Sequence, residues 1–353
     1  MDLQLLGLTA SLAEAFGPYA RDGFTAGRVV SAHTHVYRVL TEAGEMLAEV
    51  SGRLRHEAAG PRDFPAVGDW VVLQARPEGG RAVIHGILAR RSRFSRKVAG
   101  SATEEQVVAA NVDSVFLVAG LDGDFSPRRL ERALVLAWES GARPVVVLNK
   151  ADLGVGEERR REAAAAAPGV PVHAVSARTG DGLGALEAYL GSGQTVALLG
   201  SSGVGKSTLV NRLLGGGVQP TAEVRAGDDR GRHTTTHREL IVLPGGGMIV
   251  DTPGLREIQL WGGEEGLGEV FTDVGDLAAA CRFRDCRHEG EPGCAVLEAL
   301  SEGRLAAERL ASYRKLGAEQ RSFALRHDQK LQQAEKRRWR SIHRLARRHR
   351  PRG

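Results

Sequence analysis

The stretch QTVALLGSSGVGKS, residues 194–207, constrains this chain more than any other part of the sequence. Apolar and β-branched residues at 195–199 predict a buried strand, the G-x-x-x-x-G-K-S motif at 200–207 predicts a sharp turn, and residues 208–214 continue with helical apolar spacing. This order is typical of a phosphate-binding loop, because the backbone N–H groups of the turn and the helix N-terminus both face an anion. A glycine-rich turn with a purely structural purpose is the alternative interpretation.

In such a loop the amine of Lys206 reaches the β- and γ-phosphates, and the hydroxyl of Ser207 can ligate Mg²⁺. The backbone N–H groups of the loop supply further phosphate contacts. The residues that we predict to bind nucleotide here are Gly200, Ser201, Ser202, Gly203, Val204, Gly205, Lys206, Ser207 and Thr208.

The charge of the chain is unevenly distributed. The 353 residues carry a net charge of +5, yet residues 326–353 alone hold eleven lysines and arginines against two acidic residues. A cationic end on an otherwise mildly acidic protein favours a polyanionic partner such as nucleic acid, and a solvated or disordered tail is the alternative. No apolar run approaches the roughly 18 residues that span a bilayer. The N-terminus lacks a basic leader, so we predict a cytoplasmic protein that binds no membrane.

The first hundred residues predict a small β-barrel behind a peripheral N-terminal arm. Strands are expected at 27–31, 36–40, 46–50, 70–74 and 82–88, separated by turn signals. Five short strands suit an OB-type barrel, which often binds RNA. A barrel that serves only as a scaffold remains open, because Tyr37, Phe64 and Trp70 offer few platforms for base stacking. The arginine-rich run 90–97 either contacts phosphates or forms a solvated linker.

From about residue 107 the pattern alternates between strands and helices. Strands are predicted at 115–118, 144–148, 170–175, 195–199, 239–242 and 248–250, and helices at 126–140, 157–167 and 183–190. Such alternation indicates a mostly parallel sheet that is covered on both faces. Ligands of such sheets lie at the carboxyl ends of the strands.

The sequence Asn149-Lys150-Ala151-Asp152 directly follows one of these strands and selects the base. The Asp152 carboxylate can accept hydrogen bonds from guanine N1–H and the N2 amino group, which adenine does not offer. Asn149 can hold the loop, and Lys150 can lie along the base plane. A backbone N–H from the segment that contains Ser176 and Ala177 can reach guanine O6. Alone, N-K-x-D is a weak motif; together with the P-loop it predicts a GTP site.

Two further segments point to the γ-phosphate and to magnesium. Asp251 follows the strand at 248–250 and can hold Mg²⁺ through water, and the Gly254 N–H can sense the γ-phosphate. Among the threonines that follow His233, we expect Thr235 to complete the magnesium shell when γ-phosphate is present, with Thr234 the next candidate.

All three cysteines fall in one short window, Cys281-x₄-Cys286-x-His288-x₅-Cys294. Three thiolates and an imidazole make a closed tetrahedral ligand set, which predicts one structural Zn²⁺ within an α-helical domain. Reduced thiols in an ordinary loop are the alternative.

Together these motifs resemble those of GTPases, but in permuted order, since Asn149–Asp152 and Ser176–Arg178 precede the P-loop. Barrel, permuted GTPase and cysteine-rich tail resemble the RsgA (YjeQ/YloQ) family of GTPases that depend on the small ribosomal subunit. The resemblance includes Ala66-Val67-Gly68-Asp69-Trp70, Gly231-Arg232-His233-Thr234-Thr235-Thr236 and Asp285-Cys286-Arg287-His288. The expected fold is an OB-type β-barrel, a circularly permuted P-loop α/β GTPase domain and an α-helical zinc-binding domain. The domains that we expect are an arm at 1–26, the barrel at 27–100, the GTPase at 105–262, the zinc domain at 263–325 and a basic tail at 326–353.

The residue after Gly254 is leucine, Leu255, where Ras-like enzymes commonly place the glutamine that orients the attacking water. Hydrolysis without a partner should therefore be slow. The resemblance implies that His233 supplies this role, because imidazole can orient water near neutral pH. A histidine that serves only in docking is the alternative.

The resemblance implies a monomeric GTPase that binds the small (30S) ribosomal subunit and 16S rRNA and acts late in maturation of that subunit. Two other classes stay open at this stage. One is an RNA-binding scaffold that is gated by nucleotide and hydrolyses it incidentally. The other is a P-loop kinase or ATPase for a small molecule, which the guanine motif opposes.

Overall fold

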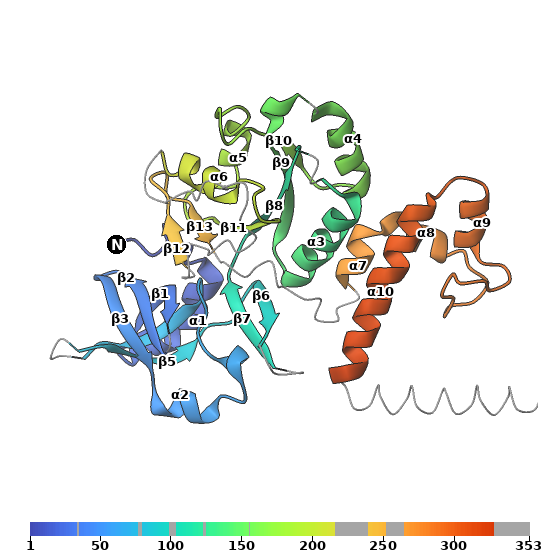
Figure 1. Ribbon diagram of the computed structural model, residues 1–353. Coiled ribbons are helices and arrows are strands. Elements are labelled where there is room, and N and C mark those ends of the chain that lie inside the picture. Colours follow the sequence, from blue (N-terminus) through green and yellow to red (C-terminus); the bar gives the residue numbers. More distant parts are fainter. Residues whose placement is uncertain are drawn as a thin grey trace, which may run out of the picture. The chain divides into compact units, whose positions relative to one another are not determined.

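The fold is that of a computed structural model, and it consists of two compact units, Met1–Gln259 and Leu260–Gly353 (Figure 1). The structure describes residues 1–33, 35–76, 80–98, 104–122, 125–154, 156–215, 239–251 and 265–327.

The first unit begins with a closed five-stranded barrel. Its strands are β1 (Thr25–His33), β2 (Val36–Thr41), β3 (Gly44–Val50), β4 (Trp70–Gln74) and β5 (Ala82–Ile87). They pair in the order β1-β2-β3-β5-β4, β4 returns to β1, and β3–β5 is the parallel pair. This confirms the predicted barrel. The shorter elements around it are α1 (Ala10–Arg21), α2 (Gly52–Glu57) and η1 (Pro61–Asp63).

The barrel core takes up the aromatic residues that the sequence offered as stacking platforms. Tyr37 and Trp70 have exposed fractions of 5% and 0%. Tyr37 packs with Val29, Val39 and other inward-facing residues, and Phe64 lies against the same cluster. Tyr37 and Trp70 therefore hold the barrel together and do not present their faces to a base.

The arginine-rich run after the barrel forms a strand, so its interpretation as a solvated linker is wrong. β6 (Arg93–Lys97) and β7 (Glu105–Ala110) make an antiparallel hairpin. The side chain of Phe94 is buried. The Arg90 guanidinium donates to both carboxylate oxygens of the buried Asp69, at 2.9 and 2.7 Å. Arg91 and Arg93 pair with Asp113 and Glu105, so much of the charge on this run is paired within the protein.

The second part of the first unit is a mostly parallel sheet. Its strands are β8 (Ser114–Gly120), β9 (Arg143–Asn149), β10 (Val172–Ala174), β11 (Thr195–Leu199), β12 (Glu239–Val242) and β13 (Met248–Asp251). They lie in the order β10-β9-β8-β11-β13-β12, and β12 is antiparallel to β13. The other elements are α3 (Pro127–Ser140), η2 (Ala151–Leu153), α4 (Gly156–Ala166), α5 (Gly184–Glu187) and α6 (Lys206–Leu213).

Helices cover both faces of this sheet (Figure 1). Phe116 and Val118 of β8 pack with residues of α5 and α6, whereas Leu117 faces α3. The alternation follows from the period of two along a strand. The predicted α/β architecture is confirmed, and three parallel strands precede the P-loop strand in the chain.

The second unit is helical within the residues that the structure describes. It comprises α7 (Glu265–Val270), α8 (Thr272–Ala278), α9 (Ala295–Ser301) and α10 (Ala307–His327), with the cysteine-rich loop between α8 and α9. The Phe271 ring packs edge-on against Tyr313 at 5.5 Å between centroids. The Arg309 guanidinium lies 4.3 Å above the same ring and pairs with Asp273. Across the described parts of both units, no helix combines the length and the apolar character that a membrane span requires.

Gly68, before β4, provides a test of how tightly the barrel packs against the hairpin. Its φ is +89°, and a Cβ there would lie 2.1 Å from the Ala110 carbonyl oxygen. We expect Gly68→Ala to lower the free energy of unfolding by roughly 2–4 kcal/mol, from backbone strain and overpacking together. Denaturant unfolding measures this. Gly44→Ala is the control for strain alone, because its φ is +114° and nothing lies within 4 Å of its Cβ; equal losses in both variants would contradict the predicted clash.

Candidate guanine-nucleotide site

The predicted site residues of the first unit converge at the carboxyl edge of the parallel sheet. β9 ends at Asn149, β11 is followed by Gly200, and β13 ends at Asp251. Motifs that lie far apart in the chain therefore meet, because β9, β8, β11 and β13 are consecutive parallel strands that end at one edge of the sheet. Gly254, Thr235, Thr234, His233 and Leu255 lie outside the described residues.

The P-loop turns tightly at two glycines. A Cβ on Gly200 would lie 2.3 Å from the Val118 carbonyl oxygen, and a Cβ on Gly205, whose φ is +96°, would lie 2.3 Å from Nδ2 of Asn149. Glycine is thus required at Gly205 by both conformation and space. The Lys206 amine donates to the carbonyl oxygens of Gly200 and Ser201 at 2.7 and 2.6 Å. The cation therefore lies over the loop, where phosphate oxygens can also accept from it.

The amide of Asn149 connects the base-recognition loops to the P-loop. Its Nδ2 donates to the Val204 carbonyl at 2.8 Å, and its Oδ1 accepts from the Ala177 N–H at 2.9 Å. Asn149 is 2% exposed. Because a buried amide must satisfy both its donor and its acceptor, these two bonds fix the three segments relative to one another.

The Asp152 carboxylate is held from two sides. Its Oδ1 accepts from the Ser176 hydroxyl at 2.6 Å, and its Oδ2 accepts from Nε and Nη2 of Arg178 at 3.0 and 2.6 Å. The hydrogen bond from Ser176 and those from Arg178 hold the pKa of Asp152 below its usual value. The carboxylate is therefore ionised at neutral pH and able to accept hydrogen bonds.

These loops line a cavity of about 220 Å³. Its walls are Asn149, Lys150, Asp152, Leu153, Ala177, Arg178, Gly205 and Thr208. The cavity thus combines apolar side chains with a carboxylate and a lysine, a lining that suits a ligand with both apolar and polar parts. The structure thus brings together the three motifs that the sequence placed apart, Asn149–Asp152, Ser176–Arg178 and the P-loop.

Sequence reasoning missed several side chains at this edge. The Arg178 side chain pairs with Asp152, and Lys150, whose φ is +67°, pairs with Asp122. Arg212 of α6 donates to the carbonyl oxygens of Ala177 and Arg178 at 3.1 and 2.6 Å. No local pattern predicts these contacts, because each joins two loops that meet only in the folded sheet.

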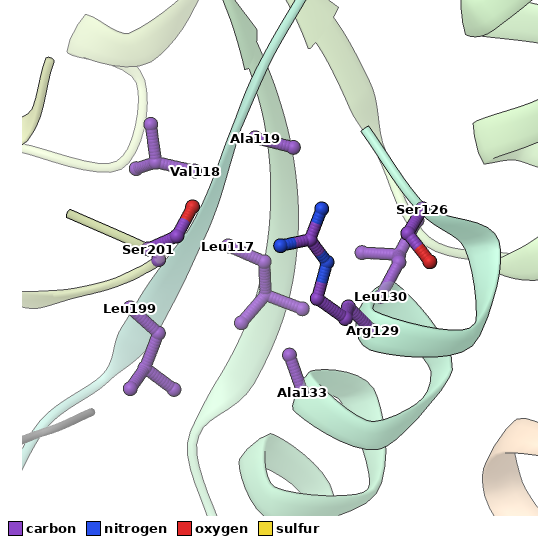
Figure 2. A pocket seen from close by; sticks show the side chains of 10 residues that line it. Leu117, Val118, Ala119, Ser126, Arg129, Leu130, Ala133, Leu199 and Ser201 are labelled. Carbon is purple, nitrogen blue, oxygen red and sulfur yellow. The ribbon is translucent and has the colours of Figure 1, made fainter. Parts of the chain in front are cut away.

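A second cavity, of about 130 Å³, lies on the α3 side of the P-loop (Figure 2). Leu117, Leu130 and Leu199 line it together with Gly200 and Ser201. Figure 2 shows the Arg129 side chain extending from α3 into this space. The sequence did predict a helix after β8, and this could have indicated that Arg129 lies near the site. A helix that begins at the carboxyl edge of the sheet places its first turn beside the ligand.

The cysteine cluster in the second unit could hold a metal ion. One donor atom from each of Cys281, Cys286, His288 and Cys294 lies within 4.8 Å of the others. The Cys281 and Cys294 sulfurs are 3.9 Å apart, and Nδ1 of His288 lies 3.6 and 3.4 Å from them. Burial lowers the pKa of His288, which favours the neutral imidazole that ligates metals.

The Asn149 amide permits a direct test of this geometry. We expect Asn149→Ala to weaken GDP binding about tenfold, because the buried Val204 carbonyl and Ala177 N–H lose their partner and the loops separate. Fluorescent-nucleotide titration measures the affinity, and thermal unfolding checks that the variant is folded. Asn211→Ala removes the same amide from α6 outside the cavity walls and should bind GDP normally. Unchanged affinity in Asn149→Ala would contradict the connecting role.

Comparison with known proteins gives the family. The family model for the RsgA GTPase matches residues 87–261. A "Small ribosomal subunit biogenesis GTPase RsgA" from Opitutus terrae is 50% identical over 97% of this chain and 96% of its own length. A protein of the same name from Syntrophotalea carbinolica is 43% identical over 99% of this chain and 98% of its own.

Two solved structures have the same architecture. YjeQ from Thermotoga maritima has a TM-score of 0.63 and 33% identity, covering 84% of this chain and 98% of that one. YloQ, described as a circularly permuted GTPase, has a TM-score of 0.61 and 26% identity, covering 87% of this chain and 97% of its own. This chain therefore belongs to the RsgA GTPase family and is a GTP hydrolase.

Proposed function

We propose that this GTPase binds the small (30S) ribosomal subunit and its 16S rRNA, acts in late maturation of that subunit, and turns over GTP faster when it is bound there. The observation that supports guanine-nucleotide binding is the position of the Asn149 amide. It connects the loop that carries Asp152 to the P-loop, and both loops line one cavity. The relatives' name, small ribosomal subunit biogenesis GTPase, supports the partner.

In this proposal Asp152 accepts hydrogen bonds from guanine N1–H and the N2 amino group, and Ser176 holds the carboxylate in place. The Ala177 N–H already donates to Asn149 at 2.9 Å. We therefore assign the contact with guanine O6 to the Arg178 N–H, the next donor along the same loop. Lys150 borders the cavity beside the base plane.

The phosphates would lie over residues 200–208, with the Lys206 amine on the β- and γ-phosphates. Ser207, Asp251 and Thr235 would hold Mg²⁺, which neutralises charge on those phosphates. The Gly254 N–H would contact the γ-phosphate. Ser207 is exposed at the start of α6, and Asp251 is half-buried at the end of β13, so both are accessible from the same edge of the sheet.

For the chemical step we propose that His233 orients the attacking water, since Leu255 cannot. GTP turnover by the free protein would therefore be slow. Contact with the small subunit would supply the water orientation that the free protein lacks.

We assign RNA contact to the barrel, residues 27–100, and to the basic tail, 326–353. The other proposed domains are the arm at 1–26, the GTPase at 105–262 and the zinc domain at 263–325. The protein would act as a monomer in the cytoplasm.

We propose that the metal of the second unit is one structural Zn²⁺. Two sulfurs in a tetrahedral zinc site with bonds of about 2.3 Å lie about 3.8 Å apart. The separation of 3.9 Å between Cys281 and Cys294 fits that geometry. Four protein donors leave no coordination position for substrate, so the ion would stabilise the loop between α8 and α9.

The base assignment predicts a change of substrate in Asp152→Asn. An amide can donate to the O2 carbonyl of xanthine but repels the N2 amino group of guanine. We expect GTP turnover to fall at least tenfold and turnover of xanthosine triphosphate to rise, both measured with and without small subunits. ATP serves as the comparison nucleotide.

Asp181→Asn is the matched control. Asp181 lies on the loop that follows Ser176, where its carboxylate accepts from Thr179, and it does not line the cavity. It should keep the preference for GTP. A preference for GTP that survives in Asp152→Asn would contradict the base assignment, and wild-type turnover that small subunits do not raise would contradict the proposed partner.

Metal content provides an independent prediction. Wild-type protein should contain about one equivalent of zinc by elemental analysis, and a chelator should lower its thermal unfolding temperature. His288→Ala should lose most of the metal, whereas His173→Ala, which removes a histidine of β10, should retain it. Protein that carries no zinc and is indifferent to chelator would contradict a structural ion.

A further inference from the structure

The barrel and the GTPase sheet are joined at the edge strand β12, beside the catalytic edge of the sheet. Ser31 of β1 pairs with Glu239 of β12, and Glu239 pairs in turn with Asp251 at the end of β13. The barrel strand is therefore one strand away from the residue to which we assign a magnesium contact. This joint continues the sheet from β12 into β1.

One side chain of the barrel contacts β12 directly. Nη1 of Arg38 donates to Oε1 of Glu239 at 2.8 Å. Nε and Nη2 of the same guanidinium donate to the two carboxylate oxygens of Glu45, at 2.8 and 2.9 Å. Because the bidentate pair with Glu45 orients the planar guanidinium, its remaining edge is directed at Glu239.

The other end of the joint is fixed more firmly. Arg28 is 1% exposed, and its Nη2 donates to the Thr195 hydroxyl at 2.8 Å and to the Asn111 carbonyl at 3.1 Å. Its Nη1 lies 3.4 Å from the Met248 sulfur. Thr195 begins the P-loop strand β11, so this end of β1 is held by a buried contact at the start of β11 and β13, away from the nucleotide.

The two contacts differ in how easily they can change. Arg28 is buried among fixed partners, whereas the side chains of Arg38 and Glu239 are 38% and 45% exposed. Arg38 lies on β2, and the face formed by strands 2 and 3 is the one with which OB-type barrels bind nucleic acid. A polyanion on that face would compete with Glu239 for Nη1 of Arg38, because a phosphate oxygen, like a carboxylate oxygen, accepts a charge-assisted hydrogen bond from a guanidinium.

We propose that Arg38 is a positioning residue, whose ion pair with Glu239 transmits binding of the small subunit at the barrel to strand β12, and through Asp251 to GTP turnover. This rests on the proposed function and specifies its regulation. For binding the coupling is reciprocal: by whatever factor the bound subunit changes nucleotide affinity, nucleotide changes the affinity of the barrel for the subunit.

The test uses the full-length protein and purified small ribosomal subunits. GTP turnover is measured against subunit concentration for wild type, Arg38→Ala, Arg38→Lys, Glu239→Ala and the Arg38→Ala/Glu239→Ala double variant. Each curve gives the turnover without subunits, the maximal stimulated turnover and the subunit concentration for half-maximal effect. Nucleotide affinity and thermal unfolding are measured on the same samples.

We expect both alanine variants to reduce the ratio of stimulated to unstimulated turnover by about two- to fivefold, the range that one exposed ion pair can transmit. Because either variant removes the contact that the polyanion would displace, unstimulated turnover should rise toward the stimulated rate, whereas GDP affinity and unfolding temperature should stay at wild-type values. The double variant should be no worse than either single one, because the two residues act through one contact. Arg38→Lys, which keeps the charge, should recover part of the stimulation.

Arg53→Ala is the matched control, because it removes an exposed ion pair with Glu57, at 2.7 Å, from the same barrel away from β12. It should be stimulated like wild type. Full stimulation of Arg38→Ala, or effects of the two single variants that multiply in the double variant, would overturn the coupling and leave the proposed function standing. A wild-type protein that subunits do not stimulate would overturn both.

Discussion

The buried amide of Asn149 is the contact on which the nucleotide site depends. A guanine nucleotide needs a carboxylate at one end and a cradle of N–H groups at the other, and these groups come from loops after different strands. Backbone packing alone positions such loops loosely. The hydrogen bonds from Asn149 to Val204 and from Ala177 to Asn149 set the spacing between the loop that carries Asp152 and the P-loop. Gly205 permits this approach because it lacks a Cβ.

Permutation leaves this contact intact because the contact is made in space and not along the chain. The sheet order β10-β9-β8-β11-β13-β12 brings the carboxyl ends of β9 and β11 to one edge whichever strand comes first in the sequence. What permutation changes is the covalent connection: the chain enters the sheet from the barrel and leaves it after β13 for the second unit. The strand β13 is therefore joined to the barrel through β12.

The sequence predicted the framework of the site well, and its side-chain contacts poorly. The bounds of β11 and of α3 follow from a short apolar run and from a proline at the first helical position, which are local signals. The hairpin of β6 and β7 was missed because β6 holds a single apolar residue, Phe94, and its register shifts between Phe94 and Ser95. The pairing of Arg178 with Asp152 joins the loops after β9 and β10, and Arg212 joins α6 to the loop after β10. No short window of sequence contains both partners of either contact.

Arg28 makes a similar buried contact at the joint between the barrel and the GTPase sheet. A fully buried guanidinium is costly, and burial lowers its pKa to about 10. Its hydrogen-bond partners are carbonyl, hydroxyl and thioether groups, and the ring of Trp70 lies 5.7 Å away. Such partners compensate a cation only while all of them stay in place, so a displacement of the barrel away from this point would leave the guanidinium N–H groups without acceptors at low dielectric. The joint must therefore behave as a fixed pivot at the start of β11, and any relative adjustment has to be taken up at its exposed end, where Arg38 contacts Glu239.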